Sequence, residues 1–206
     1  MMLRVKDLTV ARGGLPVLAG VSFSVDAGQA VMLRGPNGSG KTTLLRTIAR
    51  LQDPVAGQIE CDPDQVAYAA HSDGLKSMLS ARENLRFWAD VYGGGDVEAA
   101  LEAFELSRLA ERMAAHLSAG QRRRLGLARL LVVKRPIWIL DEPTVSLDEA
   151  SVALFANGVK AHLATGGLAL IATHLDLGFA AERFDVSAYR ATAEAVGLGA
   201  SDEAFL

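Results

Sequence analysis

Hydrophobic positions along the chain follow two periods, one typical of strands and one typical of helices. Alternating Leu3, Val5 and Leu8 predict a first strand, and a second strand at 17–25 follows a turn at Gly13. Shorter apolar runs predict strands near Ile59 and at 30–33, 66–69, 137–140, 168–173 and 184–189. Helical spacing predicts helices at 42–51, 80–92, 97–114, 121–131 and 151–163, and glycines 93–95 end the second of these.

The order of these elements predicts an α/β fold, because strands and helices alternate at both ends of the chain. Residues 73–116 interrupt this alternation with helical patterns alone. We therefore expect a single domain over 1–206, with a core formed by 1–72 and 117–206 and a helical subdomain at about 73–116. A chain of 206 residues, 50% of them hydrophobic, has enough apolar material for one such core.

Charge, cysteine content and hydropathy exclude several classes of function. The net charge of −3 argues against a general nucleic-acid binder, which would carry a basic excess. The single cysteine, Cys61, cannot form an internal disulfide, so we interpret it as a small structural hydrophobe in a reducing compartment. The apolar runs are too short to cross a bilayer, and the N-terminus alternates like a strand rather than a signal peptide. We expect a soluble protein that associates with membranes only through partners.

A glycine-rich segment between the predicted strand 30–33 and the predicted helix 42–51 matches the pattern GxxxxGK[ST] in full. Its glycines let backbone N–H groups converge on a triphosphate, and the start of the next helix adds partial positive charge. Lys41 is then placed to reach the β- and γ-phosphates, and the Thr42 hydroxyl to ligate Mg²⁺. By itself the loop predicts only a nucleotide binder, since kinases and GTPases share it. The predicted nucleotide-binding residues are Gly35, Pro36, Asn37, Gly38, Ser39, Gly40, Lys41, Thr42 and Thr43.

Four further motifs follow in one order. They are Leu-Ser-Ala-Gly-Gln at 117–121, an apolar strand ending in Asp-Glu-Pro at 137–143, Ser-Leu-Asp at 146–148, and Ala-Thr-His at 172–174. With the phosphate loop, they resemble the motifs of the ATP-binding-cassette family over nearly the whole chain. The resemblance implies a P-loop NTPase fold with a RecA-like core, an antiparallel β subdomain and a helical subdomain. It also implies an ATPase that uses ATP and Mg²⁺; a GTPase is disfavoured, because the sequence has no NKxD motif.

The motifs near the end of the chain supply the predicted catalytic residues. Asp141 ends an apolar strand, which places its carboxylate at the carboxyl edge of the sheet, where it would hold Mg²⁺ through water. Glu142 is placed to orient and deprotonate the attacking water. The resemblance implies that His174 contacts the γ-phosphate, and Lys41 completes the predicted catalytic set.

The segment 117–121, called the signature segment below, lies far from the phosphate loop in chain order. In the family it contacts ATP bound to the other subunit, which implies a head-to-tail homodimer with ATP at the interface. Its residues at a predicted helix start would donate to the γ-phosphate, and Asp148 would lie near the partner's phosphate loop. The residues assigned to this second half of the ATP site are Ser118, Ala119, Gly120, Gln121 and Asp148.

Three positions depart from the family pattern. Arg12 stands where many members have an aromatic residue that stacks on adenine; a guanidinium can also stack on a base. His71 stands where a glutamine usually links Mg²⁺ to the membrane partner, and a neutral imidazole can accept a hydrogen bond from metal-bound water. Ala119 replaces a glycine of the signature segment, which is a mild change.

Within the family, the chain most resembles the ATP-binding subunits of bacterial cytochrome c maturation complexes, the haem exporter group. The similarity lies in residues 71–76, 83–88, 117–129, 138–148 and 172–178. It implies a peripheral protein on the cytoplasmic face of the inner membrane, paired with integral membrane permease subunits. ATP would be used in delivering haem, by release of a haem-loaded chaperone. The expected docking site is the helical subdomain with Trp88 and the groove beside His71.

Several alternatives stay open at this point. The chain could serve a transporter for another substrate, or act as an ATP-gated assembly switch with little turnover, although an intact Glu142 argues against the switch. A cassette protein acting on DNA or ribosomes is disfavoured, because the chain has neither a long coiled-coil insertion nor a second cassette. The run of three arginines at 122–124 is interpreted as a solvated helix face, with ion pairs to a neighbour's acidic groups as the alternative.

Overall fold

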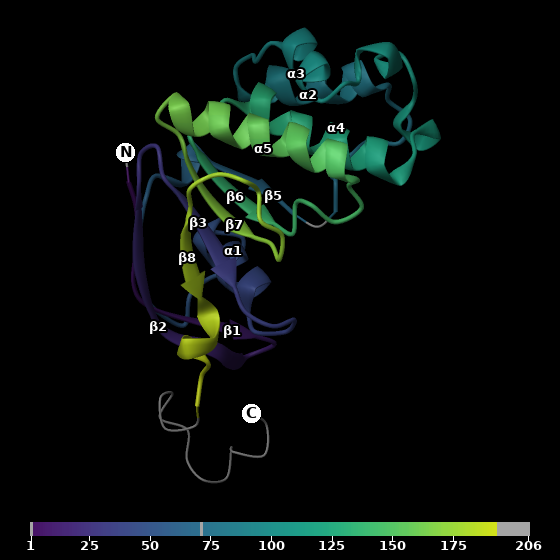
Figure 1. Ribbon diagram of the computed structural model, residues 1–206. Coiled ribbons are helices and arrows are strands. Elements are labelled where there is room, and N and C mark those ends of the chain that lie inside the picture. The colour runs from purple at the N-terminus through teal and green to yellow at the C-terminus, as the bar shows by residue number, and fades with distance from the viewer. Residues whose placement is uncertain (1, 71, 193–206) are drawn as a thin grey trace.

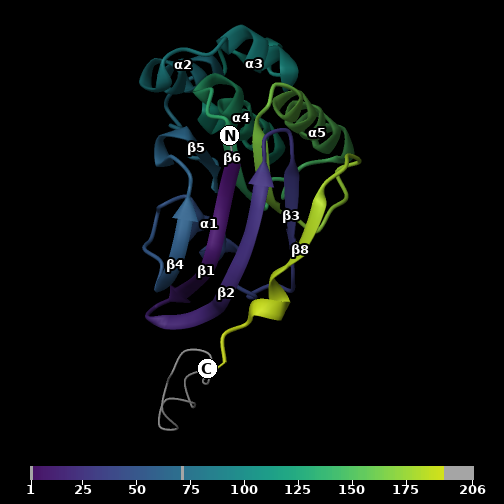
Figure 2. The same cartoon turned by 90° about the vertical axis from the view of Figure 1, so that its left-hand side faces the viewer.

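The computed structural model describes residues 2–70 and 72–192. The chain forms two β-sheets with a helix between them and a helical layer on the far side of the larger sheet (Figures 1 and 2). The strands are β1 (Met2–Arg12), β2 (Leu15–Asp26), β3 (Ala30–Arg34), β4 (Ala56–Glu60), β5 (Val66–Ala69), β6 (Ile137–Asp141), β7 (Leu168–Ala172) and β8 (Glu182–Asp185). The helices are α1 (Lys41–Ile48), α2 (Ala81–Tyr92), α3 (Val97–Ala103), α4 (Ala119–Val133) and α5 (Glu149–Ala164).

The smaller sheet is antiparallel, with strand order β2-β1-β4. Leu3 pairs with Val25, and both side chains are fully buried beneath the sheet. The register shifts between Val5 and Leu8, where Asp7 has a φ of 46° and bends the strand. The two strands predicted at the N-terminus are confirmed, and so is the antiparallel β subdomain that the resemblance implies.

The larger sheet is parallel, with strand order β5-β6-β7-β3-β8. Every residue of β6 and β7 is buried, as expected for central strands covered on both faces. Since all strands run in one direction, the carboxyl ends of β3, β6 and β7 meet at one edge. That edge carries the phosphate loop, Asp141 and the segment leading to His174.

The two faces of the parallel sheet are covered differently. Leu44, Leu45 and Ile48 of α1 pack with residues from both sheets, so α1 lies between the sheets. On the other face, Leu125 of α4 and Phe155 of α5 pack against the sheet, and α2 and α3 lie outside α4 (Figure 1). None of the helices within 2–70 and 72–192 combines the length and apolar character that a membrane crossing needs.

Three predicted elements are shorter than the sequence pattern indicates. The predicted helix 97–114 is wrong beyond Ala103, because Glu105 takes a φ of 52° and the Leu106 amide donates to the Leu101 carbonyl, which closes the helix. Two 3₁₀ turns follow, at Ser107–Leu109 and Ala114–His116.

The predicted helix 42–51 ends at Ile48 in a similar way. Arg50 has a φ of 58°, and the Leu51 amide donates to the Arg46 carbonyl. The predicted last strand is wrong beyond Asp185, whose side chain caps a 3₁₀ turn at Val186–Tyr189. The helix break at glycines 93–95 is confirmed, since Gly93 ends α2 with a φ of 90°.

Candidate active site

The phosphate loop connects the end of β3 to the first residue of α1. Gly40 has a φ of 95°, and a β-carbon on Gly35 would lie 2.8 Å from the Ser39 hydroxyl, so both positions need glycine. Lys41 is buried and its Nζ donates to the carbonyl oxygens of Gly35 at 2.7 Å and Pro36 at 3.0 Å. The ammonium is thus held over the loop, where a triphosphate would lie.

Two polar features of this loop fit a phosphate ligand. The Ser39 hydroxyl is buried and has no hydrogen-bond partner among the described residues. The first amides of α1 have no acceptor within their own helix and add partial positive charge at the loop. An anion placed here would satisfy donors that the chain itself leaves available.

A pocket of about 270 Å³ lies directly against the loop. Arg12 and Val17 from the antiparallel sheet form one side of it, and Glu142 from the end of β6 forms another. The loop contributes Asn37, Gly38, Gly40, Lys41, Thr42 and Thr43. The structure therefore brings Arg12 to the same pocket as the phosphate loop. A larger pocket of about 410 Å³, beside Trp138 and His162, contains none of the predicted site residues.

Asp141 is 3% exposed and lies at the centre of a small polar network. The Thr42 hydroxyl donates to its Oδ1 at 3.1 Å, and the Tyr68 hydroxyl donates to its Oδ2 at 3.3 Å. Burial, followed by the nearby Asp141 charge, raises the pKa of Tyr68, so Tyr68 remains a protonated donor. Tyr68 is not among the site residues predicted from the sequence, although it lies on a predicted strand that pairs with the strand ending at Asp141.

The donor set of Thr42 and Asp141 fits Mg²⁺. Hydroxyl and carboxylate oxygens are ligands that Mg²⁺ accepts, and Mg²⁺ usually takes few protein ligands with water and substrate phosphates completing its shell. Among residues 2–70 and 72–192, no group of three or more histidine, cysteine or acidic side chains could hold a metal by itself. His71, the third predicted metal residue, lies outside the described residues.

Glu142 and His174 converge beside the loop from two different strands. The His174 Nε2 lies 3.6 Å from Glu142 Oε1 and 3.3 Å from Asn37 Oδ1. The Glu142 amide donates to the Ala172 carbonyl at 2.9 Å, which fixes the segment after β6 to the end of β7. The His174 side chain is 54% exposed and that of Glu142 is 25% exposed, so both can reach a bound ligand.

Residues around the segment that carries His174 were missed by sequence analysis. The hydroxyls of Thr144 and Thr173 lie 3.0 Å apart, and Thr173 Oγ1 accepts from the Leu175 amide. Arg34 donates to the carbonyls of Thr173 and Leu175. These contacts tie the segment to the ends of β3 and β6. Thr144 and Thr173 lie within stretches of sequence that carry the family resemblance, but neither they nor Arg34 were assigned a role there.

The signature segment lies elsewhere in the chain. Ser118 is the N-cap of α4 and forms a capping box, in which Ser118 Oγ accepts from the Gln121 amide at 3.2 Å and Gln121 Oε1 accepts from the Ser118 amide at 2.9 Å. Ala119 lines a separate pocket of about 100 Å³ with Ser146, and a β-carbon on Gly120 would lie 3.3 Å from the Ser146 carbonyl oxygen. The described residues of one chain do not bring this segment to the phosphate-loop pocket.

Asp148 caps the following helix. It is exposed, and its carboxylate accepts from the Ser151 amide at 2.8 Å as the N-cap of α5. Hydrogen bonds from Ser151 lower the pKa of Asp148, so the carboxylate stays ionised. Like the signature segment, Asp148 does not line the phosphate-loop pocket.

The arginines at 122–124 do not form a single solvated face. Arg123 is only 4% exposed, so the interpretation is wrong for this residue. Arg122 donates to the Leu117 carbonyl, and Arg124 donates to the Phe104 carbonyl in the helical layer. Arg123 is buried because two loops at the edge of the sheet present carbonyl oxygens to it.

The chain matches known proteins over most of its length. The family model described as ABC transporter matches residues 18–145. The chain is 64% identical over 207 residues, covering 100% of both chains, to the cytochrome c biogenesis ATP-binding export protein CcmA of Roseobacter denitrificans. It is 65% identical over 191 residues to the protein of the same name from Ruegeria pomeroyi, covering 93% of this chain and 94% of that protein.

A solved structure supports the same relationship. The dimeric post-hydrolysis state of the ATP-binding cassette MJ0796, bound to ADP and Pi, matches with a TM-score of 0.74 and 25% identity. The match covers 84% of this chain and 88% of that chain.

Proposed function

Since the chain belongs to the ABC transporter family and is an ABC-type ATPase, we propose that it couples ATP hydrolysis to a membrane export complex in cytochrome c biogenesis. The observation that carries the chemical part is the meeting of Glu142, His174 and Asn37 beside the buried Lys41. The cytochrome c part rests on the relatives named CcmA, which match the chain over its whole length.

Each residue of the phosphate-loop pocket has a separate role in the proposed hydrolysis of ATP. Lys41 leaves the carbonyls that it now contacts and binds the β- and γ-phosphates. Glu142 accepts a proton from a water whose oxygen bonds to the γ-phosphorus, while the bond to the β–γ bridging oxygen breaks and ADP leaves. His174, already within reach of Glu142, binds the γ-phosphate and orients that water.

Mg²⁺, when bound, would neutralise charge on the β- and γ-phosphate oxygens. Thr42 and Asp141 would hold it, directly and through water. Tyr68 keeps the Asp141 carboxylate turned toward Thr42 through its own hydrogen bond. We propose that His71 also contacts the metal-bound water, because it stands where the family usually has a glutamine.

The ATP site is completed by a second copy of the chain. Ser118 is exposed, and no residue of the signature segment lines the described phosphate-loop pocket of its own chain, so the segment is available to ATP held by a partner. The solved dimer of MJ0796 with ADP and Pi supports an assembly of two cassettes. We propose a head-to-tail homodimer with Asp148 close to the partner's phosphate loop.

The chain would lie as a peripheral protein on the cytoplasmic face of the inner membrane and would be coupled there to integral permease subunits. A groove of about 250 Å³ between the helical layer and the core is lined by Tyr68, Trp88, Tyr92 and Arg129, among others. Trp88 is half-buried and the Arg129 guanidinium lies 4.7 Å from its ring centroid. This groove is the proposed docking site of a permease segment, and delivery of haem with release of a haem-loaded chaperone is the proposed output.

A turnover assay tests the proposed ATP hydrolysis, and a separate cell assay tests the proposed role in cytochrome c biogenesis. Purified full-length chain should hydrolyse ATP, Glu142→Gln should bind ATP without hydrolysing it, and Lys41→Ala should lose most ATP binding. Equal rates for wild type and Glu142→Gln would favour an ATP-gated switch with little turnover.

In the source bacterium, deletion should abolish covalent c-type cytochromes on a haem stain, and only wild type should restore them. If the cytochrome bands were unchanged in a deletion strain that has no second system for cytochrome c maturation, the ATPase activity would remain the conclusion. The chain would then be proposed to serve a transporter for another substrate.

A further inference from the structure

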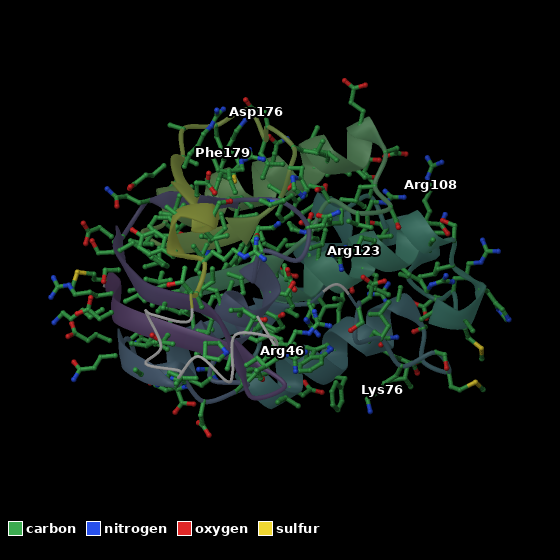
Figure 3. The ribbon with its side chains drawn as sticks, turned by 90° about the horizontal axis from the view of Figure 1, so that it is seen from below. Arg46, Lys76, Arg108, Arg123, Asp176 and Phe179 are labelled. Atoms are coloured by element: carbon green, nitrogen blue, oxygen red, sulfur yellow. The ribbon has the colours of Figure 1, made fainter. Side chains whose placement is uncertain are left out.

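We propose that Arg123 is a positioning residue that links helix α4, and thereby the signature segment, to the catalytic Glu142 of the same chain. This inference rests on the proposed function, because it gives Arg123 a part in ATP hydrolysis. Arg123 lies on α4 near the middle of the molecule in Figure 3, and 4% of it is exposed. A guanidinium is always charged, so such burial is tolerated only where acceptors meet its N–H groups.

The acceptors come from two loops at the carboxyl edge of the parallel sheet. Nε donates to the Pro143 carbonyl at 3.0 Å, and one terminal nitrogen donates to the Glu142 carbonyl at 2.7 Å. The other terminal nitrogen donates to the Ala70 carbonyl at 2.9 Å and to Asp73 Oδ1 at 3.0 Å. The planar fork therefore spans the segment after β6 and the segment after β5 at once, which a point charge such as lysine cannot do.

The contact with Glu142 acts on a strained part of the backbone. Glu142 has a φ of 47°, a conformation that non-glycine residues adopt at a cost and keep only where the surroundings enforce it. Its amide donates to the Ala172 carbonyl, and its own carbonyl accepts from Arg123 at 2.7 Å and from the Val145 amide at 3.4 Å. Arg123 makes the shorter of the two bonds to this carbonyl and so helps to fix the direction of the Glu142 side chain, which must face His174 and the water site.

The second loop is also fixed against α4. A β-carbon on Gly126 would lie 2.9 Å from the Asp73 Cβ and 3.2 Å from the Asp73 Cα, so this loop lies on the helix surface. One turn further along, a β-carbon on Gly74 would lie 3.0 Å from an Arg129 nitrogen. Asp73 thus supplies a charge to Arg123 from a position set by the helix itself.

A mechanical consequence follows from the placement of Arg123 on α4. Ser118 at the start of α4 would contact the partner's ATP, and Arg123 is on the next turn of the same rigid element. A displacement of α4 on closure of the dimer therefore moves the Glu142 carbonyl through the Arg123 side chain and its direct hydrogen bond to that carbonyl. Arg123 makes the position of Glu142 in one ATP site depend on ATP bound at the other.

The test measures ATP hydrolysis by full-length Arg123→Lys, with Arg124→Lys as the matched control. Arg124 is adjacent but donates to the Phe104 carbonyl in the helical layer, away from Glu142. We expect kcat of Arg123→Lys to fall about 10- to 100-fold with KM within about threefold, because a small misplacement of a catalytic group costs about this much. The Hill coefficient for ATP should fall toward 1, while Arg124→Lys stays within about twofold of wild type.

A second, milder variant tests the same inference in case Arg123→Lys does not fold. Asp73→Asn keeps the shape of the side chain and leaves the contacts of Arg123 with the carbonyls of Ala70, Glu142 and Pro143, so it should lower kcat and the Hill coefficient less, in the same direction. Unchanged kcat and cooperativity in folded Arg123→Lys or in Asp73→Asn, or equal losses in Arg124→Lys, would overturn the inference. A wild type no faster than Glu142→Gln would instead overturn the proposed function, and the inference with it.

Discussion

Gly126 on α4 lies so close to Asp73 that a β-carbon on the glycine would be 2.9 Å from the Asp73 Cβ and 3.1 Å from its Oδ1. Glycine in the middle of a helix is ordinarily unfavourable, by roughly 1 kcal/mol relative to alanine. Here the missing side chain leaves room for the loop that carries Asp73 and its ion pair with Arg123. The cost to helix stability is therefore offset by a close loop-to-helix contact.

Replacement of Gly126 by alanine should be destabilising in spite of the gain in helix propensity. The Asp73 backbone would have to move by a few tenths of an ångström and weaken its pair with the buried Arg123, for a net loss of about 1–2 kcal/mol. Gly158→Ala on α5 is the matched control, because its β-carbon would meet only the Phe104 ring at 3.8 Å. It should stabilise by about 0.5–1 kcal/mol in urea unfolding. Equal stabilisation by both alanines would contradict the close contact.

Substitution of Ser118 separates helix capping from the proposed ATP contact. Ser118→Asp keeps an N-cap acceptor for α4, so stability should stay within about 0.5 kcal/mol of wild type. The added negative charge would face the partner's γ-phosphate and should abolish ATP-dependent dimerisation, measured by sedimentation in the Glu142→Gln background. Ser118→Asn has the same size without the charge and should retain much of the dimer. Dimerisation of the aspartate variant at the level of the asparagine variant would rule out the shared-site assignment.

Arg12 is predicted to stack on the adenine base. It is exposed at the end of β1 and lines the phosphate-loop pocket with Val17. Stacking of an exposed cation on a ring contributes about 0.5–1 kcal/mol, so Arg12→Ala should weaken ATP binding about two- to fivefold in calorimetry. Arg12→Phe should restore the affinity, and tripolyphosphate should bind wild type and Arg12→Phe alike. An unaltered ATP affinity in Arg12→Ala would end the stacking idea.

The part of the site that could be predicted from sequence is the part encoded in contiguous residues. The phosphate loop lies in a local pattern whose glycines and Lys41 act within a few residues of one another. Asp141 and His174 were located because each follows an apolar strand, and parallel strands end at a common edge. The helix predicted from Gln121 is confirmed, but α4 begins two residues earlier, at Ala119, where Ser118 and Gln121 form a capping box.

The part that could not be predicted depends on contacts between distant segments. Arg123 lies in a run of charged residues typical of a solvated face. Its burial follows from two loops, one of which contacts it from 50 residues away in sequence and the other from 20 residues away. In the sequence, nothing distinguishes Tyr68 from other aromatic residues of strands. Its contact with Asp141 depends on the pairing of β5 with β6. The end of α3 at Ala103 has no glycine, proline or asparagine to mark it, because Glu105 adopts the left-handed conformation instead.

The packing of His162 on Trp138 predicts a pH dependence of stability that is independent of the ATP site. The two rings stack with centroids 3.8 Å apart, and His162 Nε2 lies 3.0 Å from the Pro136 carbonyl oxygen. Burial lowers the pKa of His162 below its ordinary value of 6.5, because the charged ring would be less well solvated than the neutral one. Hydrogen bonds to the carbonyls of Leu168 and Pro136 oppose this shift without cancelling it.

The sign of the effect follows from proton binding. The folded-state pKa is lower than the unfolded-state pKa, so the unfolded chain binds the proton first as the pH falls, and stability is lost below about pH 6.5. The slope should be well under about 1.4 kcal/mol per pH unit, since the ring is only partly buried and solvent screens it. Urea unfolding between pH 5 and 7.5 should therefore show a flatter profile for His162→Phe than for wild type. His116→Gln, which alters an exposed histidine, should keep the wild-type slope. Parallel profiles for wild type and His162→Phe would show that His162 is not the group responsible.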